Sequence, residues 1–143
     1  MEAILRQVLH HLEISTNGQG LVEITAPISA WVSAQKMTSG LLTIFCRHTS
    51  ASLLIQENAD PDVRSDLERF FSKLAPEIEG RYLHQSEGLD DMPSHVRAAL
   101  TQTQISIPIG SGRLGLGTWQ GIYLFEHRHA PHRREILLHL LGE

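Results

Sequence analysis

The sequence predicts an α+β fold in a single domain that spans residues 1–143. A chain of 143 residues, with 41% hydrophobic and 20% charged residues, suits one globular domain of ordinary size. Short apolar runs typical of strands are interspersed with amphipathic segments that begin with helix-start residues. No internal repeat, low-complexity segment or linker divides the chain.

The beginning of the chain contains one ambiguous element. In residues 4–14, apolar side chains recur as they do on one face of a helix, but alternation within the same segment also fits a strand. Periodicity alone favours the helix. A turn at residues 17–20 then precedes a short strand over residues 21–25 and a helix that opens at Pro27.

The middle of the chain contains two apolar runs, residues 41–46 and 53–55, that are typical of buried strands. Asp60 followed directly by a proline marks a helix start, because the carboxylate can cap the first turn. The apolar face that follows predicts a helix over residues 60–75.

The remainder of the chain predicts one more helix and mostly strands. After a loop over residues 76–90, a shorter helix opens at residue 91, and we expect Val96, Ala99 and Leu100 to pack inward. A glycine-dense connection joins the first two strands of the last third. The predicted strands there cover residues 104–109, 121–127 and 135–141.

The charged residues are dominated by arginine. The chain has ten arginines, two lysines and nine histidines, with a formal net charge of −4. Scattered arginines form no basic stripe, which argues against nucleic-acid and membrane partners, but they suit contacts with a small anionic or phosphorylated molecule. No apolar run approaches the roughly 20 residues that cross a bilayer, and a signal-peptide pattern is absent, so we expect a cytoplasmic protein.

The single cysteine, Cys46, excludes an intramolecular disulfide and a cysteine-based zinc cluster. Any zinc-like ion would therefore depend on the histidines. The cluster over residues 127–132 is the nearest set in sequence, whereas spacing alone does not show whether the dispersed His48, His84 and His95 meet in space.

Two further patterns each have more than one interpretation. The glycines of residues 110–115 match a dinucleotide-binding loop, but no helix follows them to hold a pyrophosphate. A tight bend, or a loop whose backbone N–H groups cradle a phosphate, fits the same residues. The carboxylates between Glu57 and Asp66 either hold a metal ion or a substrate, or form a solvated helix face.

Five ordered segments together resemble one family. They include the His-Thr-Ser-Ala-Ser-Leu sequence of residues 48–53 and the Gly-Thr-Trp-Gln sequence within residues 112–121. The others are residues 57–64, 90–95 and 126–128. The chain is similar along nearly its whole length to the YjbQ-like family, whose members are often labelled secondary thiamine-phosphate synthase enzymes.

The resemblance implies a compact α+β fold with a large antiparallel, sandwich-like β portion and two to three helices. It also implies a strand at the amino terminus, a homotrimer with clefts near the subunit boundaries, and a histidine metal site in some members. The activity that it implies is a weak synthesis of thiamine phosphate. The primary role of the family is not established.

The residues that match the family pattern are assigned roles by this resemblance. Asp91 and Arg64 also match, without an assigned role, while His129 and His132 fall outside the pattern. The expected catalytic residues are Glu57, Asp60, Asp62, Glu126 and Arg128. The expected substrate contacts are Thr49, Ser50, Asn58, Arg113, Thr118, Trp119, Gln120 and His127. The expected metal ligands are His48, His84 and His95.

Three functions remain open on these residues. In the synthase reaction, a pyrimidine methylene diphosphate loses pyrophosphate to a thiazole phosphate, and Mg²⁺ held by Glu57, Asp60 or Glu126 would neutralise the leaving group. Three histidines suit a zinc-like ion better than Mg²⁺ and favour a metal-dependent hydrolase of an unknown small substrate. The third is a non-catalytic protein that binds a metal or a small ligand.

Overall fold

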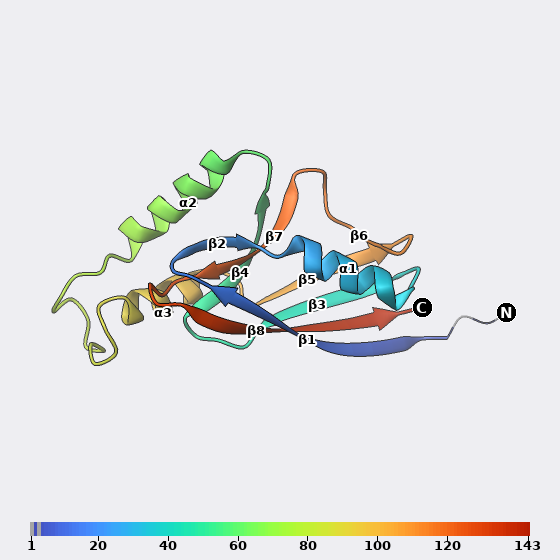
Figure 1. Ribbon diagram of the computed structural model, residues 1–143, viewed down its shortest axis with the longest axis horizontal. Coiled ribbons are helices and arrows are strands. Elements are labelled where there is room, and N and C mark those ends of the chain that lie inside the picture. The colour runs from blue at the N-terminus through green and yellow to red at the C-terminus, as the bar shows by residue number, and fades with distance from the viewer. Residues whose placement is uncertain (1, 3) are drawn as a thin grey trace.

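Eight strands and three helices make up the part of the chain that the computed structural model describes, residue 2 and residues 4–143. In chain order the elements are β1 (Arg6–Thr16), β2 (Gly20–Glu23), α1 (Thr25–Gln35), β3 (Gly40–Cys46), β4 (Ala51–Glu57), α2 (Pro61–Leu74), α3 (Asp91–Leu100), β5 (Gln104–Gly110), β6 (Arg113–Leu114), β7 (Gln120–Glu126) and β8 (His132–Gly142). Helices α2 and α3 lie at one end of the molecule and the β5–β6 hairpin at the other (Figure 1). The predicted α+β class is confirmed.

The strands form two antiparallel sheets. The larger sheet has the order β1-β8-β3-β5-β6, and the smaller sheet has the order β2-β7-β4. Strand β1 pairs with β8 along its full length, from Arg6 opposite Gly142 to Thr16 opposite His132. The helix that periodicity favours for residues 4–14 is therefore wrong, because a long antiparallel partner overrides the local pattern, and the strand implied by the resemblance is confirmed.

The main core lies between the two sheets and under α1. Its fully buried side chains come from both sheets, and α1 contributes Ile28 and Val32. On the other face of the small sheet, Tyr123 and Phe125 of β7 pack against Leu67 and Phe71 of α2. Strand β7 is thus covered on both faces along most of its length, which explains its nearly continuous apolar sequence.

The helices begin where the sequence predicts or close to it. The Asp60 carboxylate accepts a hydrogen bond from the Asp62 N–H at 2.9 Å and caps α2, so the predicted helix over residues 60–75 is confirmed. Helix α1 begins at Thr25, two residues before the predicted start at Pro27. The Thr25 hydroxyl accepts a hydrogen bond from the Ile122 N–H, which ties this end of the helix to β7.

The inward face of α3 differs from the prediction. Leu100 is 57% exposed, and the helix instead buries polar groups against the end of β7 and the end of α2. The Ser94 hydroxyl donates to the carbonyl of His127 at 2.8 Å, and Arg97 donates to the carbonyl of Ala75 at 2.7 Å. A polar helix face that is buried in this way marks the region of the candidate site.

The glycine-dense connection forms a tight hairpin between β5 and β6. Ser111 and Gly112 both have positive φ angles, 51° and 75°, and a Cβ at Gly115 would lie 2.9 Å from the Pro108 carbonyl oxygen. A turn and strand β7 follow, so the dinucleotide interpretation is excluded and the tight bend is confirmed. Among the described residues, no helix has the length and hydrophobicity needed to cross a lipid bilayer.

Candidate metal centre

The carboxyl end of β7 meets the first turn of α3 and the loop that precedes it. Asp91 is the first residue of α3, and His95 follows one turn later, so their side chains lie on the same face of the helix. His84 reaches them from the loop. These three side chains are the group of potential metal ligands within the described part of the chain whose ligand atoms all lie within 4.8 Å of one another.

One oxygen of Asp91 is shared by both histidines. Asp91 Oδ2 lies 2.6 Å from His84 Nε2 and 3.1 Å from His95 Nε2. The two imidazole rings meet edge to face with centroids 5.6 Å apart. The Asp91 side chain is only 3% exposed, whereas those of His84 and His95 are 40% and 32% exposed, so the group is open on the histidine side.

The hydrogen bond at the far side of His95 fixes which nitrogen faces Asp91. His95 Nδ1 lies 2.9 Å from the Thr49 carbonyl oxygen, and because a carbonyl can only accept, Nδ1 must donate. In the neutral ring, Nε2 then carries a lone pair directed at Asp91 Oδ2. Two acceptors face each other at 3.1 Å, and a proton or a cation between them is needed to relieve the repulsion.

Arg128 holds the carboxylates in place from the other side. It donates to Asp91 Oδ1 at 2.6 Å and to Asp90 Oδ2 at 3.1 Å, and it reaches the Glu87 carbonyl at 2.9 Å. Burial raises the pKa of Asp91, but the hydrogen bond with His84 and the charge of Arg128 act against it, and the pKa lies below its usual range. Asp91 therefore stays ionised, with Oδ1 engaged by Arg128 and Oδ2 directed at the histidines.

A buried ion pair supports the loop that carries Thr49. Arg134 Nε donates to Glu126 Oε1 at 2.8 Å, and both side chains are almost completely buried. The same guanidinium donates to the Ser50 hydroxyl at 3.0 Å and to the Ser50 carbonyl at 3.2 Å. Glu126 and Ser50, expected from the resemblance to act in catalysis and substrate binding, thus hold the loop that orients His95.

His48 lies apart from the other two predicted ligands. Its Nε2 accepts a hydrogen bond from the Glu135 N–H at 2.7 Å, so the lone pair that would bind a metal is already used. Burial and the nearby Arg134 charge lower its pKa. The structure therefore brings together two of the three predicted histidines and puts Asp91 in the place of the third.

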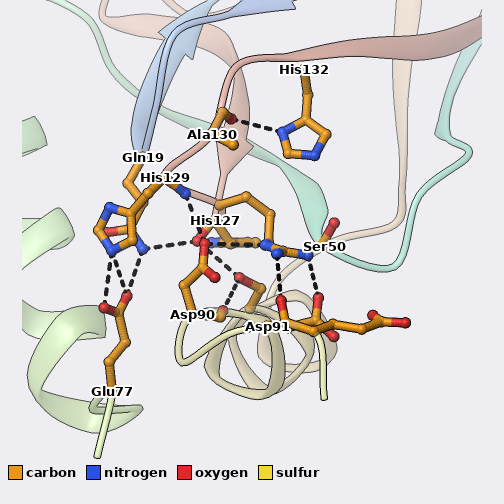
Figure 2. A network of polar contacts seen from close by, with 12 residues as sticks. Gln19, Ser50, Glu77, Asp90, Asp91, His127, His129, Ala130 and His132 are labelled. Carbon is orange, nitrogen blue, oxygen red and sulfur yellow. Dashed lines mark hydrogen bonds and ion pairs between the residues drawn. The ribbon is translucent and has the colours of Figure 1, made fainter. Parts of the chain in front are cut away.

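The local histidine cluster of residues 127–132 does not converge on one point. His129 Nε2 lies within 3.0 Å of both carboxylate oxygens of Glu77, while His132 Nδ1 contacts the Ala130 carbonyl at 2.8 Å. Figure 2 shows His129 turned toward Glu77 and His132 directed away from it. Each ring of this pair has its own partner.

His127 lies buried just after β7. It is completely buried, and its Nε2 lies 2.9 Å from the Ser52 hydroxyl. Burial, reinforced by the Arg97 charge, lowers its pKa to about 3, so the ring is neutral at physiological pH. The ring also borders a cavity of about 440 Å³ between β7 and α2, and its Nδ1 has no hydrogen-bond partner among the described residues.

Several predicted site residues lie at the opposite end of the β4–β7 pair. Ala51 pairs with Glu126 at one end and Glu57 with Gln120 at the other, a separation of six residues or about 20 Å. The Asn58 N–H donates to the Trp119 carbonyl, and Trp119 itself is 62% exposed. The predicted residues gathered near this end are Glu57, Asn58, Asp60, Asp62, Thr118, Trp119 and Gln120.

Two of the predicted carboxylates and one predicted cation lie away from the histidines. Asp60 caps α2, and Asp62 lies exposed in the first turn of the same helix. Arg113 lies in β6 and borders a shallow depression together with Lys36 and Thr38, on the hairpin end of the molecule. The structure therefore does not bring Arg113 or Asp60 to the histidines.

A small cleft adjoins His84. It has a volume of about 240 Å³ and is formed by the loop before α3 and the first turn of that helix. Its lining residues are Ile78, Glu79, Tyr82, His84, Gln85, Gly88, Leu89 and Met92. Of the three potential ligands, His84 is the one that also lines this cleft.

The sequence contained a signal for Asp91 that the histidine-only assignment overlooked. Asp91 and His95 are separated by four residues in a helix that begins at Asp91, so one turn brings both side chains to one face. Asp90 and Glu87 belong to the same neighbourhood: Asp90 binds Arg128, and the Glu87 carboxylate lies 3.7 Å from His84 Nε2.

Comparison with known proteins relates this chain to one protein family. A family model described as "UPF0047 protein YjbQ-like" matches residues 10–143. The chain is 55% identical to a UPF0047 protein of Synechocystis sp. over 141 residues, 99% of this chain and 96% of that one. It is 42% identical to the UPF0047 protein YjbQ of Escherichia coli O157:H7 over 133 residues, 92% of this chain and 96% of that one.

Solved structures have the same fold. A YbjQ-like protein from Sulfolobus solfataricus superposes with a TM-score of 0.89 at 23% identity, covering 98% of this chain and 100% of that chain. A conserved hypothetical protein from Thermus thermophilus superposes with a TM-score of 0.80 at 34% identity, covering 90% of this chain and 97% of that chain.

Proposed function

The chain belongs to the YjbQ-like UPF0047 family, and we propose that it holds one divalent, zinc-like ion on His84, Asp91 and His95 and uses it to hydrolyse a small substrate. The observation that carries this proposal is the convergence of three ligand atoms, with Asp91 Oδ2 2.6 Å from His84 Nε2 and close to His95 Nε2. The separation of 3.1 Å between Asp91 Oδ2 and His95 Nε2 is close to the roughly 3.3 Å expected between two ligands of one tetrahedral zinc ion.

The donor set favours zinc-like ions over Mg²⁺. Two imidazole nitrogens and one carboxylate oxygen are ligands that zinc accepts, whereas Mg²⁺ prefers oxygen ligands and waters. The Glu87 carboxylate, 3.7 Å from His84 Nε2, adds negative charge that favours a cation at this point. Three protein ligands leave a fourth position open, which is typical of catalytic zinc sites.

The surrounding residues hold the ligands in the geometry that the ion requires. The Thr49 carbonyl keeps the Nε2 lone pair of His95 directed inward, and Arg128 restricts Asp91 to one free oxygen. An ion bound there would polarise a carbonyl or phosphoryl oxygen and lower the pKa of a bound water. The half-exposed face of His84 is where the substrate would approach.

A first experiment tests binding and catalysis separately. The purified, metal-stripped protein is titrated with zinc and with Mg²⁺ in a calorimeter, and then assayed against a panel of carboxylic and phosphoric esters. We expect one zinc per chain, much weaker Mg²⁺ binding, and hydrolysis that requires the added zinc. Zinc binding without hydrolysis of any ester would favour a non-catalytic metal-binding protein, and the absence of zinc binding would refute the proposal.

The synthase activity implied by the family resemblance is a second candidate with a geometric requirement. A diphosphate and a heteroaromatic ring need partners such as Arg113 and Trp119, which one chain keeps at the end away from His84. In a homotrimer, a neighbouring copy could supply them.

A pyrophosphate-release assay with the pyrimidine diphosphate and the thiazole phosphate tests this candidate. A turnover that falls at least tenfold in Arg113→Ala and Trp119→Ala would support it. Absent turnover would exclude the synthase activity, and turnover that is unchanged in both variants would exclude Arg113 and Trp119 as its substrate contacts.

A further inference from the structure

The cleft beside His84 has features that restrict what the proposed metal centre can bind. Its volume of about 240 Å³ lies below the roughly 300–1,000 Å³ of sites for drug-sized ligands, so its occupant must be small. It is built entirely from a short stretch of chain, the loop before α3 and the first turn of α3. The same stretch supplies two of the proposed ligands, His84 and Asp91.

Apolar side chains form about half of the cleft wall. Ile78 is 48% exposed and Leu89 is 55% exposed, and Met92 completes this wall from α3. Exposed apolar side chains around a concave surface gain free energy when a ligand covers them. The Tyr82 hydroxyl donates to the Pro76 carbonyl at 3.3 Å, which fixes the position of its ring at the cleft.

The cleft offers no cation for a diphosphate. Among its lining residues, all of which the structure describes, Glu79 carries the only permanent charge, and none is lysine or arginine. The nearby Arg128 is already engaged by Asp90 and Asp91. An anionic ligand would therefore meet a carboxylate in the cleft and have no free guanidinium to compensate it.

We infer that this cleft receives the compact apolar or aromatic body of a small molecule, whose metal-binding head, such as a carbonyl, an amide or a hydroxamate, reaches the exposed side of His84. This inference rests on the proposed metal centre. It assigns the substrate to small acyl compounds with an apolar body and separates it from diphosphates.

Two hydroxamic acids of different size test the inference. Zinc-loaded protein is titrated with benzohydroxamic acid, which has an aromatic body, with acetohydroxamic acid, which has only a methyl group, and with inorganic pyrophosphate. We expect benzohydroxamic acid to bind at least tenfold more tightly than acetohydroxamic acid, and pyrophosphate to bind more weakly than benzohydroxamic acid.

Two leucine variants locate the effect. Leu89→Ser should lower the affinity for benzohydroxamic acid at least fivefold and leave that for acetohydroxamic acid unchanged. Leu100→Ser is a matched control, because Leu100 is 57% exposed at the end of α3 but outside the cleft, and it should change neither affinity.

The outcomes distinguish this inference from the proposal beneath it. If zinc does not bind, the metal centre is refuted and the inference falls with it. If zinc binds but the two hydroxamic acids bind equally, if Leu89→Ser has no effect, or if pyrophosphate binds most tightly, the metal centre stands and the assignment of the cleft is wrong.

Discussion

The Oδ2 atom of Asp91 lies 3.1 Å from the Nε2 atom of His95, one helical turn away on α3, and both atoms have acceptor character when the ring is neutral. This relationship organises the candidate site, because each neighbouring contact serves to keep the two atoms facing each other. The Thr49 carbonyl holds the ring and Arg128 holds the carboxylate.

Arg128 is expected to act as a positioning residue. In Arg128→Gln the second carboxylate oxygen of Asp91 loses its charged partner, and zinc affinity should fall about 10- to 100-fold, as it does when outer-shell partners of metal ligands are removed. Competition with a chromophoric chelator measures the affinity. Arg133→Gln, at an 81% exposed side chain, is the control and should keep the wild-type value.

Variants of Asp60 and Asp62 test whether the carboxylates at the start of α2 have a structural role. Asp60→Ala should lower the free energy of unfolding by about 1 kcal/mol, because the helix loses its N-cap. Asp62→Ala should change it little, since that side chain is exposed. Denaturant unfolding gives the stabilities. If Asp60→Ala leaves the stability unchanged but abolishes an activity of the protein, Asp60 has a functional role that capping does not explain.

The buried ion pair between Glu126 and Arg134 is expected to be structural. Glu126→Gln leaves Arg134 buried without its counter-charge and should cost roughly 3–5 kcal/mol of unfolding free energy. A double variant, Glu126→Leu with Arg134→Met, should recover much of this loss. Chemical denaturation of the three proteins is the measurement, and a single variant as stable as the wild type would contradict the assignment.

His127 is expected to make the protein sensitive to mild acid. Its pKa is about 3 in the folded chain and near 6.5 in the unfolded chain, so below about pH 6.5 the unfolded state takes up the extra proton. Stability should therefore fall by up to about 1.4 kcal/mol per pH unit between pH 6.5 and pH 3. Glu126, whose lowered pKa reflects its bonds to Arg134 and Thr16 despite burial, adds a further loss below about pH 4.5.

Unfolding curves measured between pH 7 and pH 5 isolate the contribution of His127. The slope of stability against pH in this window should become shallower in His127→Gln and stay unchanged in His139→Gln, whose ring contacts Gln7 of the edge strand β1. An equal slope in wild type and His127→Gln would show that this ring is not held neutral by the fold.

The sequence predicted the elements with strong local signals. The cap at Asp60 located α2, and the apolar runs located β3, β4 and β7. Strand β1 could not be found from periodicity, because its pairing with β8 depends on residues more than a hundred positions away. The inward face of α3 was also mispredicted, since its burial depends on polar contacts with the distant residues Ala75 and His127.

The candidate site was predicted in part. His84 and His95 lie close together as predicted. The sequence does not reveal that Nε2 of His48 accepts a hydrogen bond from the Glu135 backbone N–H. Family motifs likewise give no distance between residues, and the strand register separates the Trp119 segment from the histidines within one chain. These facts depend on tertiary contacts, which composition and residue spacing do not reveal.

Zinc titration of four variants tests the metal centre most directly. We expect one zinc per chain in the wild type, and at least a hundredfold loss of affinity in His84→Ala, Asp91→Asn and His95→Ala. We expect near-wild-type affinity in His48→Ala, because that ring binds the Glu135 N–H instead. Loss of zinc in His48→Ala together with retention in Asp91→Asn would refute the role of Asp91 as a ligand and favour the three-histidine site.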